Sequence, residues 1–390
     1  MNNFISDYPV ISLTKGEGQY FFGYYDIKAW DASNRYMLAH KVKFCDRIQE
    51  ADDEAVIGMI DFQDNYKFIE LTSTKAWNFQ QGAMLQWLGG QDTSKIIYND
   101  RVDNKYTSVI FDVKTKKKKV LPLPVATVTS DGKKALSINF SRMFTFRPGY
   151  GYAGIEDPYF DVLHPKDNGI FLLDLETGEK KLILSLFDIK ELHINEDLET
   201  KKILVNHITF NPDGSRFLFL PRYTHTKPDG SKWNTALFTA DLNGKNTRLL
   251  IDYGVVSHYY WTSPTQVLAY ARIKDKGREI FLLDDRTGKA EIVNKEVFNQ
   301  DAHMSTSPDG KWILGDTYKD EKGFQTLRLY NIKEKREVIL GRFFSPELFT
   351  GDIRCDLHPR WNRTGTMVSF DATFENKRGI YAIDVRSIVG

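Results

Sequence analysis

A short turn signature recurs at seven places in the chain, and this repeat restricts the possible folds more than any other feature. Three copies are strong: Thr129–Gly132 (TSDG), Asn211–Gly214 (NPDG) and Ser307–Gly310 (SPDG). Four weaker copies lie at Trp30–Asn34, Trp87–Gly90, Thr262–Thr265 and Asn362–Gly365. Asp, Asn and Gly favour tight turns, and self-similar units of this length are typical of solenoids and propellers.

Two strand patterns follow each turn in the same order. The first is a short β-rich run, at Tyr36–Ala39, Lys95–Tyr98, Ala135–Ile138, Phe217–Leu220, Val267–Tyr270, Trp312–Leu314 and Met367–Phe370. The second is an alternating strand pattern that ends in an Asp or Asn turn, at Ile57–Asp61, Ser108–Asp112, Gly169–Asp174, Ala236–Asp241, Glu279–Asp284, Thr326–Asn331 and Gly379–Asp384. A fourth strand often closes the unit, as at Lys181–Leu184. Each unit is therefore a four-stranded antiparallel blade, and the pattern predicts an all-β, seven-bladed β-propeller.

The last unit ends at Asp384 without a fourth strand. The segment Pro9–Thr14 can supply it, so that an N-terminal strand closes the ring. Residues 1–390 are then one propeller domain, with insertions near 44–54, 141–168 and 186–204. The insertion at 141–168 is rich in Arg and aromatic residues. It is either a loop packed by its own side chains or a wall over the centre of the ring.

Charge and composition exclude several classes of partner. The chain has 53 Lys and Arg against 52 Asp and Glu, a net charge of +1, which gives no reason to expect nucleic acid or an anionic membrane as partner. The segment Met1–Pro9 has no signal-peptide pattern, and the chain has no apolar run long enough to span a bilayer. Cys45 and Cys355 are the two cysteines, too few for a disulfide framework. We therefore expect a cytoplasmic protein; nothing in the sequence specifies its oligomeric state.

Four of the eight histidines occupy one structural position in consecutive blades. His207, His303 and His358 stand at the same distance before the turn glycines of their blades, and His258 stands at the same distance before Trp261 as His207 does before Phe210. This position is the start of the innermost strand, and such starts converge on one end of a propeller axis. The register therefore predicts a histidine cluster at one mouth of the ring, continued in other blades by Asp26 and by Gln80 or Gln81.

Residues near His303 and His358 are candidate metal ligands. Asp301 lies two positions before His303, and Cys355 lies three before His358. Thiolate and imidazole groups suit zinc, so these four residues predict a mononuclear metal site. The alternative is that Cys355 is a small buried hydrophobic residue.

Cationic and phenolic residues accompany the histidines. Arginine binds carboxylates in a bidentate fork, and aromatic rings stack on sugars. The candidate substrate-binding residues are Arg354, Arg360, Arg101, Tyr24, Tyr25 and Arg142. The candidate catalytic residues are His258, His207, His225, Tyr259 and Arg222.

These residues and motifs resemble those of the oligogalacturonate lyases and, more loosely, of the ulvan-lyase-like propellers among polysaccharide lyases. The resemblance rests on the blade turns, on Ser257–Trp261 (SHYYW), on the segment around His303 and on His358–Trp361 (HPRW). It implies a seven-bladed propeller, mostly cytoplasmic, that cleaves uronate-containing oligosaccharides by β-elimination. It also implies a divalent metal, often manganese, held by three histidines and a glutamine.

This sequence departs from the family pattern at two positions. Cys355 falls near the expected glutamine, and Arg360 stands where the resemblance implies a further histidine. Both changes shift the expected metal from manganese toward zinc. Arg222 and Lys232 are the nearest counterparts of the arginine that the resemblance implies for catalysis.

The function expected from the sequence is metal-assisted β-elimination of an acidic oligosaccharide. The reaction needs a cation to neutralise the carboxylate, a base and an acid. We assign the metal to His303, Cys355 and His358, the base to His258 or His207, and the acid to Tyr259 or His225. The alternative is a non-catalytic propeller that binds a glycan or a protein, because fold alone does not decide between the two.

Overall fold

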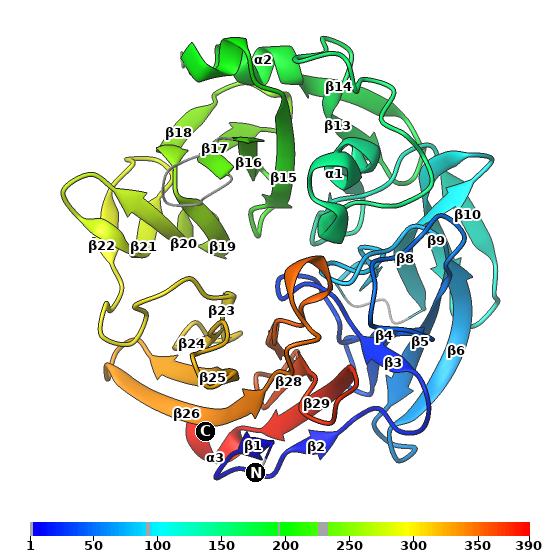
Figure 1. The fold of residues 1–390 in the computed structure, drawn as a ribbon, viewed down its shortest axis with the longest axis vertical. Helices are drawn as coiled ribbons and strands as arrows, with labels where there is room; N and C mark the ends of the chain where they lie inside the picture. The colour runs from blue at the N-terminus through cyan, green and yellow to red at the C-terminus, as the bar shows by residue number, and fades with distance from the viewer. Residues whose placement is uncertain (1–2, 91–93, 194–195, 225–232) are drawn as a thin grey trace.

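The chain forms seven antiparallel sheets arranged as blades around a central axis (Figure 1). The computed structural model describes residues 3–90, 94–193, 196–224 and 233–390. In blades one to five the chain runs from a strand at the axis to a strand at the rim, and in blades six and seven the outermost strand comes from the N-terminal segment. This arrangement confirms the predicted seven-bladed β-propeller with four-stranded antiparallel blades.

The strands of the blades follow chain order. Blades one and two contain β3 (Gln19–Phe21), β4 (Tyr36–Val42), β5 (Ala55–Asp61), β6 (Lys67–Thr74), β7 (Gln86–Trp87), β8 (Lys95–Val102), β9 (Lys105–Asp112) and β10 (Lys118–Leu121). Blades three and four contain β11 (Thr127–Val128), β12 (Lys134–Ser137), β13 (Gly169–Asp174), β14 (Lys180–Ser185), β15 (Ile203–Phe210), β16 (Arg216–Thr224), β17 (Trp233–Asp241) and β18 (Arg248–Gly254). Blades five to seven contain β19 (Val256–Ser263), β20 (Gln266–Ile273), β21 (Gly277–Asp284), β22 (Ala290–Ile292), β23 (Met304–Thr306), β24 (Trp312–Asp316), β25 (Phe324–Asn331), β26 (Arg336–Phe344), β27 (Arg360–Trp361), β28 (Met367–Ala372) and β29 (Gly379–Asp384).

The recurring turn signature joins the inner strand of a blade to its second strand. The turn glycines Gly132, Gly214, Gly310 and Gly365 have φ between 70° and 72°, a left-handed conformation that costs other residues more. Each also donates its backbone N–H to the carbonyl at the start of the turn, as Gly214 does to Asn211 at 3.0 Å. The repeat is therefore a repeat of backbone conformation.

Two short N-terminal strands close the ring. Strand β2 (Ile11–Ser12) pairs with β29 and completes blade seven, which confirms the predicted closure. Strand β1 (Phe4–Ile5) pairs with β26 and adds a fifth strand to blade six. The N-terminal segment thus holds two neighbouring blades together.

Short helices lie in the segments that connect or follow the strands. They are α1 (Phe140–Phe146), η1 (Pro148–Tyr150), α2 (Leu186–Glu191), η2 (Glu196–Glu199), η3 (Gly351–Ile353) and α3 (Arg386–Val389). Helix α1 begins where the Asn139 side chain accepts from the Arg142 backbone, and α2 begins with a capping box between Ser185 and Asp188. Among the described residues, no helix has the length and apolar character needed to cross a bilayer.

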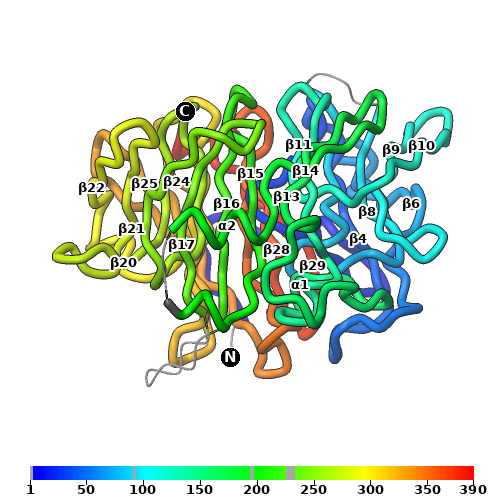
Figure 2. Tube along the Cα trace, turned by 90° about the horizontal axis from the view of Figure 1, so that it is seen from above, coloured from blue at the N-terminus to red at the C-terminus, as the bar shows by residue number. Residues whose placement is uncertain are grey.

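The insertion at 141–168 meets the segment before β27 on one face of the ring (Figure 2). The Gly149 N–H donates to the Asp352 side chain at 3.2 Å, and the Gln49 amide from the first insertion donates to the Gly151 carbonyl at 3.1 Å. The Gln80 amide donates to the Arg354 carbonyl at 2.9 Å. These contacts join four connecting segments on this face: the first insertion, the β6–β7 connection, the insertion at 141–168 and the segment before β27.

Candidate functional site: a histidine–carboxylate cluster on the propeller axis

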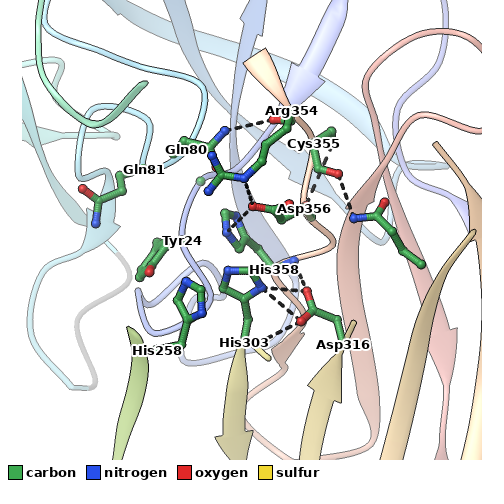
Figure 3. Close-up of polar contacts among 12 residues, drawn as sticks. Tyr24, Gln80, Gln81, His258, His303, Asp316, Arg354, Cys355, Asp356 and His358 are labelled. Carbon is green, nitrogen blue, oxygen red and sulfur yellow. Dashed lines mark hydrogen bonds and ion pairs between the residues drawn. The ribbon is translucent and has the colours of Figure 1, made fainter. Parts of the chain in front are cut away.

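The four histidines of the shared register meet on the axis. The His258 and His303 ring centroids are 4.0 Å apart, those of His303 and His358 are 4.3 Å apart, and those of His207 and His258 are 6.3 Å apart. Their exposed fractions are 7, 4, 1 and 2 % for His207, His258, His303 and His358. Four imidazoles from four blades thus form one buried cluster, of which Figure 3 shows His258, His303 and His358.

The backbone is unusual at two of these histidines. His207 has φ of 59° and His358 has φ of 40°, a region that residues with a side chain rarely adopt. His207 lies at a bulge in β15, between Asn206 and Ile208, where its pairing with β16 is interrupted. Bulges re-aim side chains, and strained conformations persist where the surrounding structure enforces them. At both positions the fold therefore maintains a costly backbone conformation.

Tyr24 lies in the middle of the cluster. Its ring stacks on His207 at 4.9 Å and meets the His358 ring edge-on at 4.9 Å. Burial, with Tyr25 beside it, holds the pKa of Tyr24 well above the usual range of a phenol. Tyr25 packs 5.3 Å from the His303 ring, and its hydroxyl bonds the backbone of Tyr259. Tyr24 is therefore a protonated hydroxyl in contact with the imidazoles.

The proton positions on His207 follow from its two partners. The Gln81 amide Nε2 lies 3.3 Å from Nδ1, and the Tyr24 hydroxyl lies 3.3 Å from Nε2. Burial and the nearby Arg222 keep the pKa of His207 well below normal, so the ring is neutral. Since an amide nitrogen only donates, Nδ1 accepts and Nε2 carries the proton. His207 then donates to the Tyr24 oxygen and leaves the Tyr24 proton free.

His258 forms a dyad with Asp301. The His258 Nδ1 lies 2.9 Å from the Asp301 carboxylate, and the Ser257 hydroxyl lies 3.3 Å from the same nitrogen. Burial lowers the pKa of His258, although Asp301 opposes the shift. The imidazole is therefore neutral near pH 7, and Nε2 is the nitrogen that can accept a proton.

His303 forms a second dyad, with Asp316 at the end of β24. Both Asp316 oxygens lie about 3 Å from His303 Nδ1, at 3.0 and 2.9 Å, and Asp316 also accepts from the backbone N–H groups of His303 and His358. Burial opposes charge on His303, but the carboxylates of Asp316, Asp356 and Asp301 together raise its pKa. Sequence reasoning missed Asp316, because it stands on a second strand, outside the histidine register.

His303, Asp356 and His358 form a candidate metal site. One ligand atom from each lies within 4.8 Å of the other two, and all three residues are buried. The Nε2 atoms of His303 and His358 are enclosed without a hydrogen-bond partner among the described residues. Because a buried nitrogen without a partner is costly, the donor set fits a bound cation. Its two imidazoles and one carboxylate suit a divalent transition metal.

Cys355 and Asp301, two predicted ligands, lie outside this group of three. Burial raises the pKa of the Cys355 thiol to about 12, so the sulfur carries its proton. Asp301 is engaged by His258 at 2.9 Å. The neighbour of Cys355, Asp356, contributes the carboxylate that sequence reasoning did not single out.

Two predicted substrate-binding arginines are paired with carboxylates near the cluster. Arg354 donates to Asp356 at 2.7 Å and to the Tyr150 hydroxyl at 2.6 Å. Arg360 is buried and donates to Asp371 at 2.5 Å. Arg354 therefore orients Asp356, a candidate metal ligand, whereas Arg360 forms an ion pair with Asp371 inside blade seven.

The other predicted residues lie in different settings. All five N–H groups of Arg142 donate within the described chain, to Asp157 and to four backbone carbonyls, so Arg142 anchors the insertion to β15. Arg101 pairs with Asp52 at 3.3 Å. Arg222 is buried close to His207. His225 and Lys232 lie outside the described residues.

Tyr150 shows that the insertion reaches the cluster. Its ring meets His207 edge-on at 5.3 Å, and Arg147, at the end of α1, lies 4.1 Å above its face. The sequence signal for this contact was the density of aromatic and arginine residues in the insertion. Which of them faces the axis depends on where α1 and η1 begin.

Fold and site together define a class of protein: a seven-bladed propeller with a buried histidine–carboxylate cluster on its axis. No protein-family model matches the chain, and none of the curated proteins matches it. Solved structures do. An oligogalacturonate lyase in complex with manganese superposes with a TM-score of 0.68 at 15 % identity, covering 97 % of this chain and 93 % of the other.

Two further structures support the fold. Oligogalacturonate lyase from Vibrio parahaemolyticus has a TM-score of 0.68 at 17 % identity, over 98 % of this chain and 96 % of its own. The β-propeller domain of the Trilobed protease from Pyrococcus furiosus has a TM-score of 0.52 at 10 % identity, over 95 % of both chains. The resemblance to oligogalacturonate lyases noted in the sequence is therefore confirmed as a likeness of fold over nearly the whole chain.

Proposed function

We propose that this protein is a lyase-like enzyme that cleaves uronate-containing oligosaccharides by metal-assisted β-elimination. The observation that carries the proposal is the buried group of His303, Asp356 and His358 beside the His258–Asp301 dyad. An oligogalacturonate lyase in complex with manganese has a similar fold, which supports the same chemistry here.

His303, Asp356 and His358 would hold a divalent ion, either manganese or zinc. When bound, the ion would neutralise the uronate carboxylate and make the proton on the adjacent carbon more acidic. Asp316 holds His303 Nδ1, which leaves Nε2 as the nitrogen that would bind the ion. Arg354 holds the Asp356 carboxylate through Nε at 2.7 Å.

His258 would be the base. Its neutral imidazole accepts the proton from the carbon next to the carboxylate, and the Asp301 carboxylate stabilises the positive ring that results. The electron pair of the broken C–H bond forms the new C=C bond, and the bond from the neighbouring carbon to the glycosidic oxygen breaks. His207, the other candidate base, already donates to Tyr24 through Nε2.

The Tyr24 hydroxyl would be the acid that returns a proton to the leaving oxygen. Its raised pKa keeps it protonated, and His207 donates to its oxygen rather than accepting its proton. Tyr259 and His225, the acids expected from the sequence, remain predictions. Tyr24, expected to bind substrate, thus gains a chemical role in the proposal.

A substrate screen with metal analysis tests the proposal. Pectic, ulvan-type and glycosaminoglycan oligosaccharides are incubated with the protein, and the 4,5-unsaturated product is followed by its ultraviolet absorbance, with and without a chelator. We expect one metal per chain, lost in His303→Ala and His358→Ala but kept in His164→Gln, a histidine bonded to the Lys201 carbonyl away from the axis.

We also expect product formation to fall in His258→Ala while metal content stays unchanged. Activity that survives both His258→Ala and His303→Ala would show that the proposal is wrong. A folded, metal-free protein that binds an acidic oligosaccharide without product would favour the alternative, a non-catalytic binding propeller.

A further inference from the structure

The ring has two mouths, and the histidine cluster lies toward one of them. In blade six the inner strand leads from His303 to the turn residue Ser307, four positions later, which is about 13 Å of extended chain. The recurring turns therefore surround the opposite mouth. A cavity of about 390 Å³ lies among the turns of blades four to seven, and small-molecule sites measure about 300–1,000 Å³. Its lining includes Pro212, Thr262, Ser307 and Asn362.

The segment between β3 and β4 connects this turn-side cavity to the cluster. Asp26 and Lys28 line the turn-side cavity, and both also line a neighbouring cavity of about 280 Å³. The neighbouring cavity reaches Tyr24 and His207, which stack on each other in the cluster. The axis is therefore hollow between the cluster and the turns, and the turn-side cavity is a space apart from the candidate metal ligands.

Lys28 and Arg363 bring positive charge to the turn-side cavity. Burial and the nearby charge of Arg363 lower the pKa of Lys28 to about 8. Lys28 Nζ donates to the Ser130 carbonyl at 3.4 Å, and Arg363 Nε donates to the Trp30 carbonyl at 3.0 Å. Neither cation forms an ion pair within the described parts of the chain. Two neighbouring cations that bind only neutral carbonyls favour the addition of an anion.

The carboxylates that act on these two cations have other partners. Asp131, which acts on Lys28, accepts from a threonine hydroxyl of its own turn at 2.6 Å. Asp31, which acts on Arg363, accepts from two backbone N–H groups of its own turn. Asp26 is the only carboxylate residue in the lining among the described residues, so Lys28 and Arg363 outnumber it.

Hydrogen-bond donors without acceptors belong to the same lining. The indole N–H groups of Trp261 and Trp361, the Ser305 hydroxyl and one terminal nitrogen of Arg363 are enclosed without a hydrogen-bond partner among the described residues. Trp261 is 6 % exposed and Ser305 is 4 % exposed. Because buried donors without acceptors are costly, this lining suits a molecule that is rich in acceptor oxygens.

We propose that the turn-side cavity binds a small polyhydroxy oxyanion, a sugar acid or sugar phosphate whose charged group contacts Lys28 and Arg363. Lysine supplies a point charge and arginine a fork for the oxygens of a carboxylate or a phosphate. Trp261 and Trp361 bring apolar rings for the carbon skeleton, and Asp26 accepts from its hydroxyl groups. The inference does not depend on the proposed reaction, because none of these residues is a candidate metal ligand.

Calorimetric titration of protein dialysed against a chelator tests the site. The probes are gluconate, inorganic phosphate and sorbitol, which has the polyhydroxy chain of gluconate without its charge. We expect gluconate or phosphate to bind and sorbitol not to bind, and the tighter anion identifies the charged group. Lys28→Met should weaken anion binding at least about tenfold, the value of one charge-assisted contact. Arg386→Gln, which changes an exposed arginine paired with Asp384, should leave it unchanged.

Two further variants separate the site from the cluster and from effects on folding. His303→Ala should keep the affinity for the anion, because His303 is not part of the turn-side lining. Arg363→Lys keeps the charge but not the fork, so we expect a smaller loss than in Lys28→Met, and it replaces that variant if thermal unfolding shows Lys28→Met to be misfolded.

Three results overturn the site. They are the absence of anion binding by wild type, equal binding of gluconate and sorbitol, and an affinity that is unchanged in Lys28→Met and Arg363→Lys. Binding that is lost in His303→Ala but kept in Lys28→Met would locate the anion at the histidine cluster and would also refute the proposal.

Discussion

Asp316→Asn tests whether the His303–Asp316 dyad prepares a metal ligand. The Asp316 carboxylate accepts from His303 Nδ1 at 2.9 Å and from the backbone of His303 and His358 at 2.9 and 3.3 Å. An anion at this place fixes the proton on Nδ1 and leaves the Nε2 lone pair for a cation. An amide is neutral and can turn its NH₂ group to Nδ1, which moves the ring proton to Nε2.

The expected loss of metal affinity follows from the loss of the Asp316 carboxylate that holds His303 Nδ1. Removing an outer partner of a ligating histidine costs about 10- to 100-fold in metal affinity, or about 1.4 to 2.8 kcal/mol. We expect Asp316→Asn to fall in this range for both manganese and zinc, and we expect product formation to require correspondingly more metal. The isosteric change keeps the volume of the side chain, so the fold should be retained.

Competition with a chromogenic chelator measures the affinity, and thermal unfolding of the metal-free protein checks the fold. Asp309→Asn is the matched control, because Asp309 lies in the turn of the same blade and bonds only local groups, the Ser307 hydroxyl and the Lys311 backbone. An unchanged metal affinity in Asp316→Asn would refute the reasoning, as would an equal loss in Asp309→Asn.

Three further predictions concern the stability of the fold and the role of Tyr24. His40 is buried between Phe22 O and Ala83 N, and burial lowers its pKa to about 4. The unfolded chain therefore binds the extra proton first, and stability falls as pH drops from 6.5 toward 4, by about 3 kcal/mol. Urea unfolding at several pH values should show this slope in wild type and a weaker one in His40→Gln. Arg142→Met leaves the buried Asp157 without its partner and should cost about 3 to 5 kcal/mol in urea unfolding; a loss below 1 kcal/mol would contradict the anchoring role. Tyr24→Phe should lower kcat about 100-fold with metal content unchanged, and wild-type turnover in this variant would remove Tyr24 from the reaction.

The fold was predictable because its determinants are local. The residue types of the turns at Gly132, Gly214 and Gly310 predict their backbone conformation. The strand bounds predicted after the turns match the observed bounds, as at Gly169–Asp174 and Gly379–Asp384. Strand β1 was not predicted, because Phe4–Ile5 is too short for a pattern and its partner β26 is remote in the chain.

The site was predictable only where it follows the repeat. The histidines share a register, so their convergence could be inferred from the sequence. Asp356 could not be distinguished from Cys355, because neighbouring residues in an irregular segment face different directions and only the backbone decides which one meets His303. Asp316 and Tyr150 reach the cluster from a second strand and an insertion, contacts that depend on the closed ring.

The two N-terminal strands have a consequence for the order of assembly on the ribosome. Residues 4–5 and 11–12 leave the exit tunnel well before their partners in β26 and β29 are synthesised. Blades one to five can form as translation proceeds, whereas β1 and β2 have no strand to pair with until β26 and β29 have been synthesised. The candidate metal ligands His303, Asp356 and His358 belong to the same late blades. The candidate site is thus complete only after blades six and seven have been synthesised and have paired with the early strands.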